Sequence, residues 1–268
     1  MNSFLGAARA SHLRFVIAAG LMLAGCAGGQ GAGPDGPPAS SAPRSSPSGA
    51  GSPTAAESRN YSDAQLQSLL KGVKHPSGAQ LQVEDPRALV SGAKGDYQDA
   101  SDPKRRITPR ECELFDSYRM LNAATGTLAG GMLIPVSRAD QEAMMTTGAF
   151  RYLDVIHPAS QTDRSEFRQR LEAYSSCNTV REISLLPGKL QMAIVRLPAK
   201  VNADRGFAVS QLTSDGARIG MICVGGTKAG VDVIYRQTVN GNAADSLDFN
   251  AAAREGADVV NQVLGKLP

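Results

Sequence analysis

Two histidines beyond the first sixty residues, His75 and His157, are the side chains best suited to proton transfer or to metal binding. Each is followed by Pro, a turn context that indicates a solvated ring. The chain has neither the Cys-x-x-Cys nor the His-x-x-x-His spacing that is typical of transition-metal sites. We therefore expect no metal site and no cofactor.

A nucleophilic serine would be expected on a sharp turn of the form Gly-x-Ser-x-Gly, and the sequence does not contain this motif. The Gly-Gly-Thr-Lys-Ala-Gly segment 225–230 looks like a phosphate-binding loop, but it lacks the Gly-Lys-Ser/Thr ending and leads into a strand instead of a helix. We interpret it as a hairpin turn that needs positive φ. The sequence thus predicts no enzyme. An envelope hydrolase whose Ser/His/Asp set no motif reveals is an alternative.

The sharpest cluster of charge is formed by Lys104, Arg105 and Arg106, with Arg110 four residues further on. We interpret this basic cluster as a solvated face. Contact with anionic lipid head groups or cell-envelope polymers is the functional alternative. Two carboxylate pairs lack the Gly and Glu of a calcium loop and are interpreted as turn residues, Asp99 with Asp102 and Asp245 with Asp248.

Composition argues against a nucleic-acid partner. The 268 residues carry 28 Lys and Arg against 25 Asp and Glu, whereas nucleic-acid proteins normally show a clear basic excess. Aromatic residues make up 5% of the chain and none is Trp, so the side chains that stack on bases are scarce.

Residues 1–25 have the pattern of a signal peptide. A basic start precedes the apolar run 15–23, and about nine residues at 1.5 Å each cannot cross a hydrocarbon layer of about 30 Å. The run ends in Leu23-Ala24-Gly25-Cys26, which resembles the lipobox of bacterial lipoproteins. The resemblance implies cleavage before Cys26, a lipid on its thiol and often an acyl chain on the new amino terminus. We therefore expect anchoring to the cell membrane, facing the extracytoplasmic side. An ordinary secretory signal is the alternative.

Residues 26–59 are expected to be the lipidated Cys26 and a disordered tether. Of the 30 residues 27–56, 26 are Gly, Ala, Pro or Ser, and no apolar periodicity is present. A segment with nothing to bury cannot offset an ordering entropy of about 1–2 kcal/mol per residue. The tether would lift the remaining residues off the membrane.

Residues 60–268 are predicted to fold as one domain. A first helix begins at Ser62, and a short strand around residues 81–83 precedes a long surface loop over 86–107. Further elements are expected as helices over 108–123, 137–145, 163–177 and 249–264, and as strands over 126–136, 150–156, 180–186, 190–197, 207–212, 219–224 and 231–239. Short turns between the late strands favour antiparallel neighbours. The fold class is α+β, an antiparallel sheet of about five or six strands packed with helices.

Three cysteines remain after Cys26, and three pairings among them are possible. We favour a disulfide between Cys112 and Cys177, because Cys177 ends a helix in a polar Ser-Ser-Cys-Asn setting. Cys223 lies within an apolar Ile-Cys-Val run and is expected to be a small buried hydrophobe.

The chain resembles the actinobacterial, chiefly mycobacterial, lipoproteins and kinase ectodomains called PknH-like sensor domains. The resemblance rests on the opening helix 61–66, a first core Cys soon after Pro109, and a second Cys that closes a helix at 174–177. It implies an α+β module with a cleft for a ligand outside the cell. Kinase ectodomains of this family carry two bridges, whereas the three core Cys here allow only one. The chain has no kinase domain and no spanning helix, so signalling across the membrane does not carry over.

The function expected from these observations is a membrane-anchored cell-surface lipoprotein with a non-catalytic sensor or ligand-binding domain, whose partner is an extracellular ligand or envelope component. The alternative is a lipid carrier of the envelope with an apolar cavity. Residues that could line such a cavity are Gly130, Gly131, Met132, Met144 and Met145, although core packing explains them as well.

Overall fold

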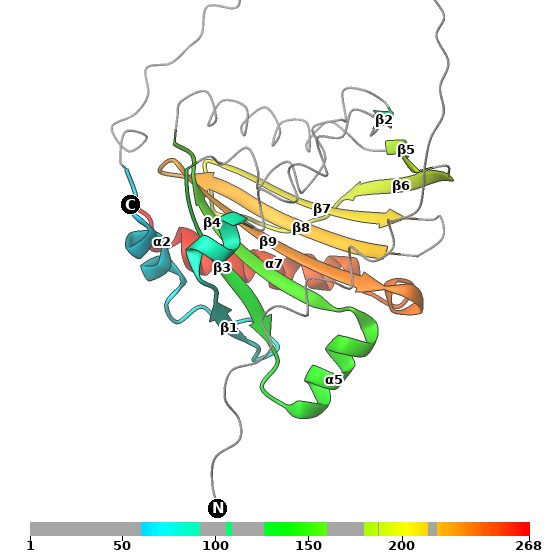
Figure 1. The fold of residues 1–268 in the computed structure, drawn as a ribbon, viewed down its shortest axis with the longest axis horizontal. Coiled ribbons are helices and arrows are strands. Elements are labelled where there is room, and N and C mark those ends of the chain that lie inside the picture. Colours follow the sequence, from blue (N-terminus) through cyan, green and yellow to red (C-terminus); the bar gives the residue numbers. More distant parts are fainter. Residues whose placement is uncertain (1–59, 92–105, 109–125, 160–179, 187, 214–218) are drawn as a thin grey trace, which may run out of the picture. The chain divides into compact units, whose positions relative to one another are not determined.

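The computed structural model of the chain describes residues 60–91, 106–108, 126–159, 180–186, 188–213 and 219–268 (Figure 1). All of them belong to one compact unit. The signal segment, the tether and most of the helices expected over 108–123 and 163–177 lie outside these residues. No helix of the described residues is long and apolar enough to cross a membrane.

The described strands form one antiparallel sheet of nine strands, in the order β1-β3-β4-β9-β8-β7-β6-β5-β2. Their bounds are β1 Gln80–Val83, β2 Arg106–Thr108, β3 Thr127–Ile134, β4 Phe150–His157, β5 Val180–Leu186, β6 Gly188–Arg196, β7 Arg205–Thr213, β8 Ile219–Lys228 and β9 Val231–Asn240. The expected α+β class is confirmed, with more strands than the five or six predicted. The segment expected to be a loop over 86–107 contains a helical turn at 86–91 and the first two residues of β2.

The described helices are α2 Asp63–Leu70, α5 Arg138–Thr147, the 3-10 helix η2 Gly241–Ala244 and α7 Phe249–Leu264. Three of them, α2, α5 and α7, begin where the sequence predicted, whereas the 3-10 helix η2 was not predicted. Ser62 and Gln65 form a capping box at the start of α2, because each satisfies a backbone N–H of the other. Ser137 caps α5 and Asp248 caps α7 in the same way, with a side-chain oxygen that accepts from the backbone.

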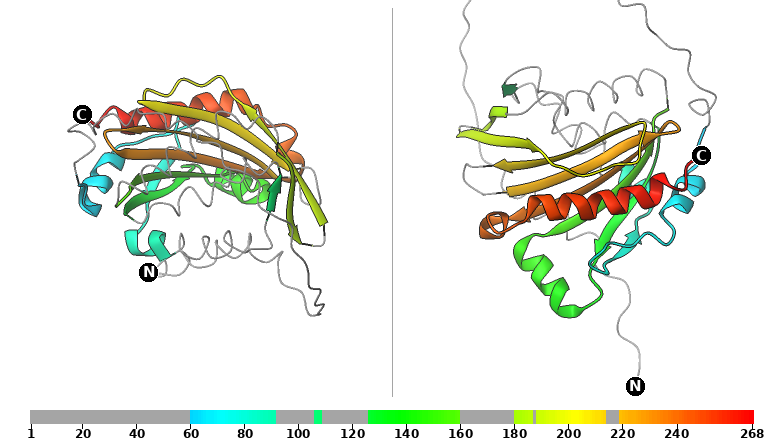
Figure 2. Two further views of the ribbon diagram at one scale, coloured as in Figure 1. Left: turned by 90° about the horizontal axis from the view of Figure 1, so that it is seen from above. Right: turned by 180° about the vertical axis from the view of Figure 1, so that it is seen from behind.

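Helix α7 lies along one face of the sheet (Figures 1 and 2). Its inward side chains include Val259, Val260, Val263 and Leu264, all fully buried. They share one core with the buried leucines of α2 and with the strand residues that alternate toward α7. Burial of each such side chain contributes about 1.5–3 kcal/mol, so the seam between α7 and the sheet is a main source of stability.

Two lysines bind backbone carbonyls at the C-terminal ends of α7 and α2. Lys228 donates from Nζ to the carbonyls of Leu264 and Leu267 at 3.1 and 2.9 Å, after the last turn of α7. Lys266 donates from Nζ to the carbonyls of Leu69 and Lys71 at 2.6 and 2.8 Å, at the end of α2. A cation at a helix C-terminus satisfies carbonyls that have no partner within the helix.

Candidate functional site

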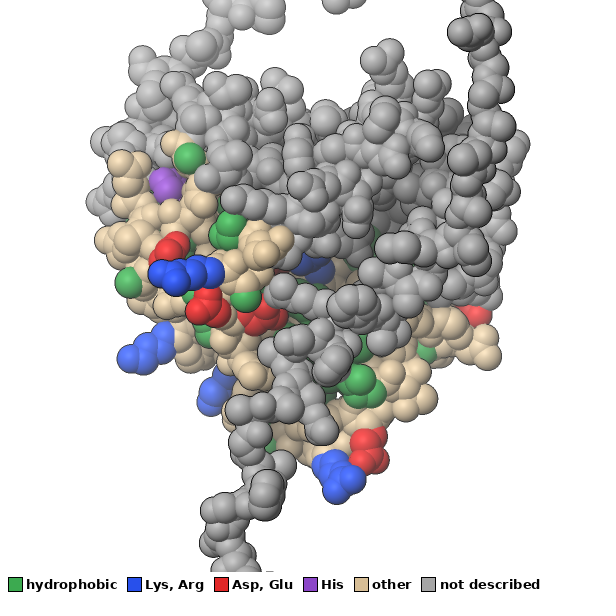
Figure 3. Space-filling view, in the orientation of Figure 1, with side chains coloured by type: hydrophobic (Ala, Val, Ile, Leu, Met, Phe, Trp, Pro, Cys, Tyr) green, Lys and Arg blue, Asp and Glu red, His purple; other side chains and the backbone are tan. Residues whose placement is uncertain are grey.

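Most of the site residues predicted from the sequence lie outside the described residues, namely Cys26, Lys104, Arg105, Arg110, Cys112 and Cys177. Arg106 is the first residue of β2. On the described part of the face in Figure 3, acidic and basic side chains are interspersed and no patch of a single sign stands out. The lipidation, the disulfide and the basic contact surface therefore stay predictions.

Cys223 is a buried thiol near the middle of β8, as expected from its apolar neighbours. Its side chain is fully buried and it forms no disulfide. Burial raises the pKa of the Cys223 thiol to about 12, so the group is neutral and unreactive at physiological pH.

The expectation of two solvated histidine rings is wrong. His75 and His157 are 2% and 4% exposed. The His157 ring meets the Gly230 carbonyl through Nδ1 at 3.1 Å and packs edge-on against Tyr61, with ring centroids 5.2 Å apart. A following proline indicates a turn of the backbone, but it does not decide whether the preceding side chain points outward or back into the core.

The turn at His75 shows how the ring is directed inward. His75 accepts at its carbonyl from the N–H of Gly78 at 2.8 Å, and its own N–H donates to the Ala79 carbonyl at 3.1 Å. Pro76 occupies the second position of the turn, and Gly78 adopts a φ of 84°, which glycine accommodates without strain. An isolated bridge between Lys74 and Gln80 closes this small hairpin. We call residues 74–80 the His75 hairpin.

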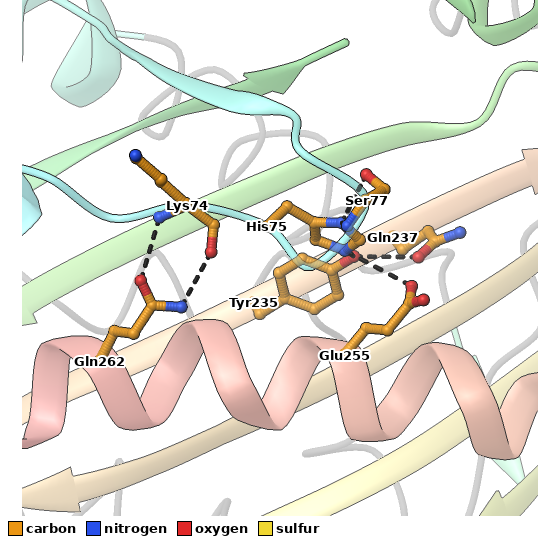
Figure 4. A network of polar contacts seen from close by, with 7 residues as sticks. All are labelled: Lys74, His75, Ser77, Tyr235, Gln237, Glu255 and Gln262. Carbon is orange, nitrogen blue, oxygen red and sulfur yellow. Dashed lines mark hydrogen bonds and ion pairs between the residues drawn. The ribbon is translucent and has the colours of Figure 1, made fainter.

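The hydrogen bonds of the ring fix its protonation pattern (Figure 4). Nδ1 accepts from the backbone N–H of Ser77 at 3.2 Å and lies 2.8 Å from the Ser77 hydroxyl. The proton of the neutral imidazole is therefore on Nε2, which donates to the Tyr235 hydroxyl at 3.2 Å. Tyr235 in turn donates to Oε1 of Gln237 at 2.9 Å. The hairpin, strand β9 and helix α7 thus meet around one buried imidazole.

Charged groups flank the ring on two sides. Nε2 of His75 lies 3.7 Å from Oε2 of Glu255 on α7, whose side chain is 39% exposed. Arg151 of β4 contributes a positive charge that disfavours protonation of the ring. Burial, and secondly the positive charge of Arg151, lowers the pKa of His75 from 6.5 to about 4. Burial also raises the pKa of Tyr235, so both groups are neutral near pH 7. The cluster is a neutral hydrogen-bonded network that resists protonation.

Glycine at position 256 makes room for the Tyr235 ring. A Cβ at residue 256 would lie 2.5 Å from Cδ1 and 2.8 Å from Cε1 of Tyr235. The aromatic ring therefore packs directly on the backbone of α7, with its hydroxyl held toward His75. This contact explains a glycine in the middle of a helix, where it would otherwise cost about 1 kcal/mol relative to alanine.

Two neighbouring side-chain amides of α7 form hydrogen bonds with the backbone of the two segments that border the helix. Gln262 accepts from the N–H of Lys74 at 3.0 Å and donates to its carbonyl at 2.8 Å (Figure 4). Asn261 accepts from the N–H of Asn202 at 2.7 Å and donates to the Lys200 carbonyl at 3.0 Å. Each amide replaces the two hydrogen bonds that a neighbouring strand would make. The His75 hairpin is therefore bonded to α7 through the backbone of Lys74 and to β9 through its imidazole.

A second polar cluster occupies the opposite face of the sheet. Asp154 of β4 and Arg236 of β9 form an ion pair with 2.9 Å between Oδ2 and Nη2, and their side chains are 6% and 16% exposed. The guanidinium carbon of Arg236 lies 5.6 Å from the centre of the Tyr152 ring. Burial raises the pKa of Asp154, and the positive charge of Arg236 opposes this shift. A buried ion pair rarely adds net stability, and buried charges gather at functional sites, so this cluster is a candidate for ligand contact.

The glycine-rich segment 225–230 is a hairpin connection, but a shorter one than expected. Strand β8 continues through Lys228, and the turn consists of Ala229 and Gly230, with φ of 51° and 75°. Gly225 and Gly226 lie within the strand, where a Cβ would come within 3.0 Å of Phe207 and 2.6 Å of Ala203. The segment therefore forms no anion-binding loop.

The residues suggested for a lipid-carrier cavity do not line one together. A Cβ on Gly131 would collide with the Gln82 carbonyl, and a Cβ on Gly130 would lie 2.7 Å from Oδ1 of Asp154. Met145 is half exposed, whereas Met144 is buried on α5. The space beside the two glycines is filled by neighbouring backbone and by a carboxylate. A surface hollow of about 340 Å³ lies elsewhere, lined by Asp63, Pro86, Arg87, Val90 and Ser91.

The described residues contain no group of three or more His, Cys, Asp or Glu side chains arranged to hold a metal ion. Of the carboxylate pair 245/248, Asp245 lies in a turn as interpreted, whereas Asp248 is the N-cap of α7. Asp99 and Asp102 lie outside the described residues.

No protein-family model matches the chain, and no curated protein matches it. Among solved structures, the chain is similar to the extracellular domain of PknH from Mycobacterium tuberculosis. The sequence identity is 9%, the match covers 78% of this chain and 99% of that chain, and the TM-score is 0.39.

Proposed function

We propose that this chain is a lipoprotein of the cell envelope, anchored by lipid on Cys26 at the extracytoplasmic side of the membrane. Its α+β domain binds an extracellular ligand or envelope component without catalysing a reaction. The observation that carries the anchoring is the order of three sequence features: a short apolar run, Leu23-Ala24-Gly25-Cys26, and a tether poor in apolar side chains. Two or three acyl chains, at about 0.8 kcal/mol per buried CH₂, hold a protein at a membrane far more firmly than one myristoyl chain.

Binding without catalysis is supported by how the described histidines are used. Nδ1 of His75 is occupied by the Ser77 N–H, and Nε2 is directed at Tyr235. The His157 ring contacts the Gly230 carbonyl. Both imidazoles hold the fold together, and a general base needs a nitrogen that can reach a substrate.

The Asp154–Arg236–Tyr152 cluster is the described site that best suits ligand contact. It places a cation, a carboxylate and the partly exposed ring of Tyr152 on one face of the sheet. Such a set would recognise a polar or charged ligand better than an aliphatic one, because the charges are already desolvated by their surroundings. This favours a polar ligand over the acyl chain of a carrier.

Anchoring is tested by replacing Cys26. The Cys26→Ala chain should leave the membrane fraction and should not incorporate an alkyne-tagged fatty acid. Cys223→Ala, the matched control, should stay in the membrane fraction and incorporate the label, like the wild type. A Cys26→Ala chain that stayed with the membrane and carried label would refute the proposed anchor.

Ligand binding is tested by native mass spectrometry of the full chain purified from its own host. A bound polar molecule that is retained by the wild type and lost in Tyr152→Leu would support the proposed site. This substitution removes the ring without stranding a buried charge. A co-purified acylated lipid would favour the carrier instead, and turnover of the bound molecule would favour the hydrolase.

A further inference from the structure

Residues 74–78 of the His75 hairpin are joined to the rest of the domain mainly by polar contacts. The His75 imidazole reaches Tyr235, and the backbone of Lys74 is bonded twice to Gln262. Pro76, Ser77 and Gly78 at the tip of the hairpin are exposed, so the tip has no apolar anchor. Val73 and Ala79, on either side of this segment, are buried in the apolar core, and Gln80 pairs with Ile134 of β3. A change in the charge of the His75 imidazole can therefore weaken the contacts that hold this segment against α7 and β9.

Protonation of His75 would oppose these contacts. A proton on Nδ1 would oppose the Ser77 N–H that now donates to this nitrogen, and the Ser77 hydroxyl, 2.8 Å away, would have to turn so that its oxygen accepts the proton. The imidazolium would also be buried near the positive charge of Arg151 from β4. Tyr235 from β9 is neutral, and Glu255 from α7 is the nearby carboxylate that could offset the new charge. Glu255 is partly in water and lies 3.7 Å away, so it compensates only in part.

We propose that His75 is an acid-operated latch: uptake of one proton releases residues 74–78 from α7 and from Tyr235, while Ala79 stays in the core and the rest of the domain stays folded. Opening also frees the Tyr235 hydroxyl from its contact with the imidazole. The inference is independent of the proposed ligand and of the lipid anchor.

The size of the effect follows from the difference in proton affinity. With a pKa of about 4 in the closed hairpin and 6.5 for a solvated ring, the ratio of open to closed hairpin rises as the pH falls through this window. Proton linkage gives a rise of roughly 20-fold between pH 7 and pH 5. The ratio levels off below about pH 4, where both forms carry the proton.

Hydrogen exchange of individual amides, corrected for the intrinsic pH dependence of exchange, tests the proposal on the full chain in detergent. The reporters are the N–H groups of Lys74 and His75, which in the closed hairpin are bonded to Gln262 of α7 and to the Ala79 carbonyl. Their opening ratio should rise roughly 20-fold from pH 7 to pH 5. The amides of Val259 and Val260 in α7 should keep their protection, because they report the folded core.

Two variants isolate the imidazole. His75→Gln cannot be protonated, so its hairpin amides should show less than about a two-fold change over the same range. Arg151→Met removes the repelling charge, which raises the pKa of His75 in the closed form and weakens the response. If His75→Gln does not fold, the Arg151→Met comparison and an NMR titration of the His75 ring in the wild type still test whether protonation of His75 opens the hairpin.

Three results would overturn the latch. The first is an equal loss of protection in the hairpin and in α7, which would mean global unfolding. The second is no pH response of the hairpin amides. The third is a His75 titration midpoint at or above 6.5.

Discussion

Replacing Gly256 by Ala sets two well-understood effects against each other in the middle of α7. Alanine is the better helix former, and on propensity alone the change should stabilise the domain by about 1 kcal/mol. The new methyl group, however, would lie 2.5 Å from Cδ1 of the Tyr235 ring, closer than real carbon contacts allow. The sign of the change in the free energy of unfolding therefore shows which effect dominates.

Packing should dominate, because the Tyr235 ring cannot retreat. The ring is fully buried, and its hydroxyl is bonded to His75 and Gln237. Inserting a methyl group into a packed core costs about 1–3 kcal/mol, and a ring held at both ends belongs to the upper part of that range. After the propensity gain, we expect Gly256→Ala to lower the free energy of unfolding by about 2 kcal/mol.

Urea unfolding followed by circular dichroism measures this change, with the wild type and every variant purified in the same way. The control is the same substitution in a Tyr235→Ala background, where the clash is gone and Gly256→Ala should be neutral or stabilising. The difference between the two backgrounds is then a coupling free energy of about 2–3 kcal/mol. A Gly256→Ala chain more stable than the wild type would refute the reasoning, since it would mean that the ring has room.

The remaining predictions concern the β8–β9 turn and the disulfide. Ala229 holds a φ of 51°, a left-handed conformation that costs a non-glycine residue about 1–2 kcal/mol, so Ala229→Gly should raise the free energy of unfolding by about 0.5–1 kcal/mol in urea titrations. A decrease would show that the buried methyl group matters more than the strain. Mass mapping of a non-reduced digest should find Cys112 joined to Cys177, as the polar Ser-Ser-Cys-Asn setting of Cys177 predicts, and a bond from Cys177 to Cys223 would contradict it.

Local elements were the most predictable part of this fold. The alternation of apolar and polar residues located β9, and apolar residues at helical spacing located α7 to the residue. Strand β2 was missed because three residues are too few for a periodic signal. The order of the sheet could not be predicted either, since β4 pairs with β9 across more than seventy residues of chain.

The polar clusters escaped prediction for a related reason. His75 and Tyr235 are 160 residues apart, and nothing in either local sequence indicates the other. The sequence did contain a signal for the second cluster. Asp154 and Arg236 are charged residues inside apolar runs, and buried charges are rare unless they are paired. Their pairing, however, depends on the register between β4 and β9, which only the fold reveals.

The bond from Lys266 to the carbonyls of Leu69 and Lys71 has a consequence for the order in which this domain folds during synthesis. Helix α2 is made early, yet its C-terminal carbonyls wait for a side chain almost two hundred positions later. Until residue 266 arrives, the leucines of α2 lack the neighbouring face of α7 that completes their core. Helix α2 is thus made early but stabilised late, and its apolar side stays open in the meantime.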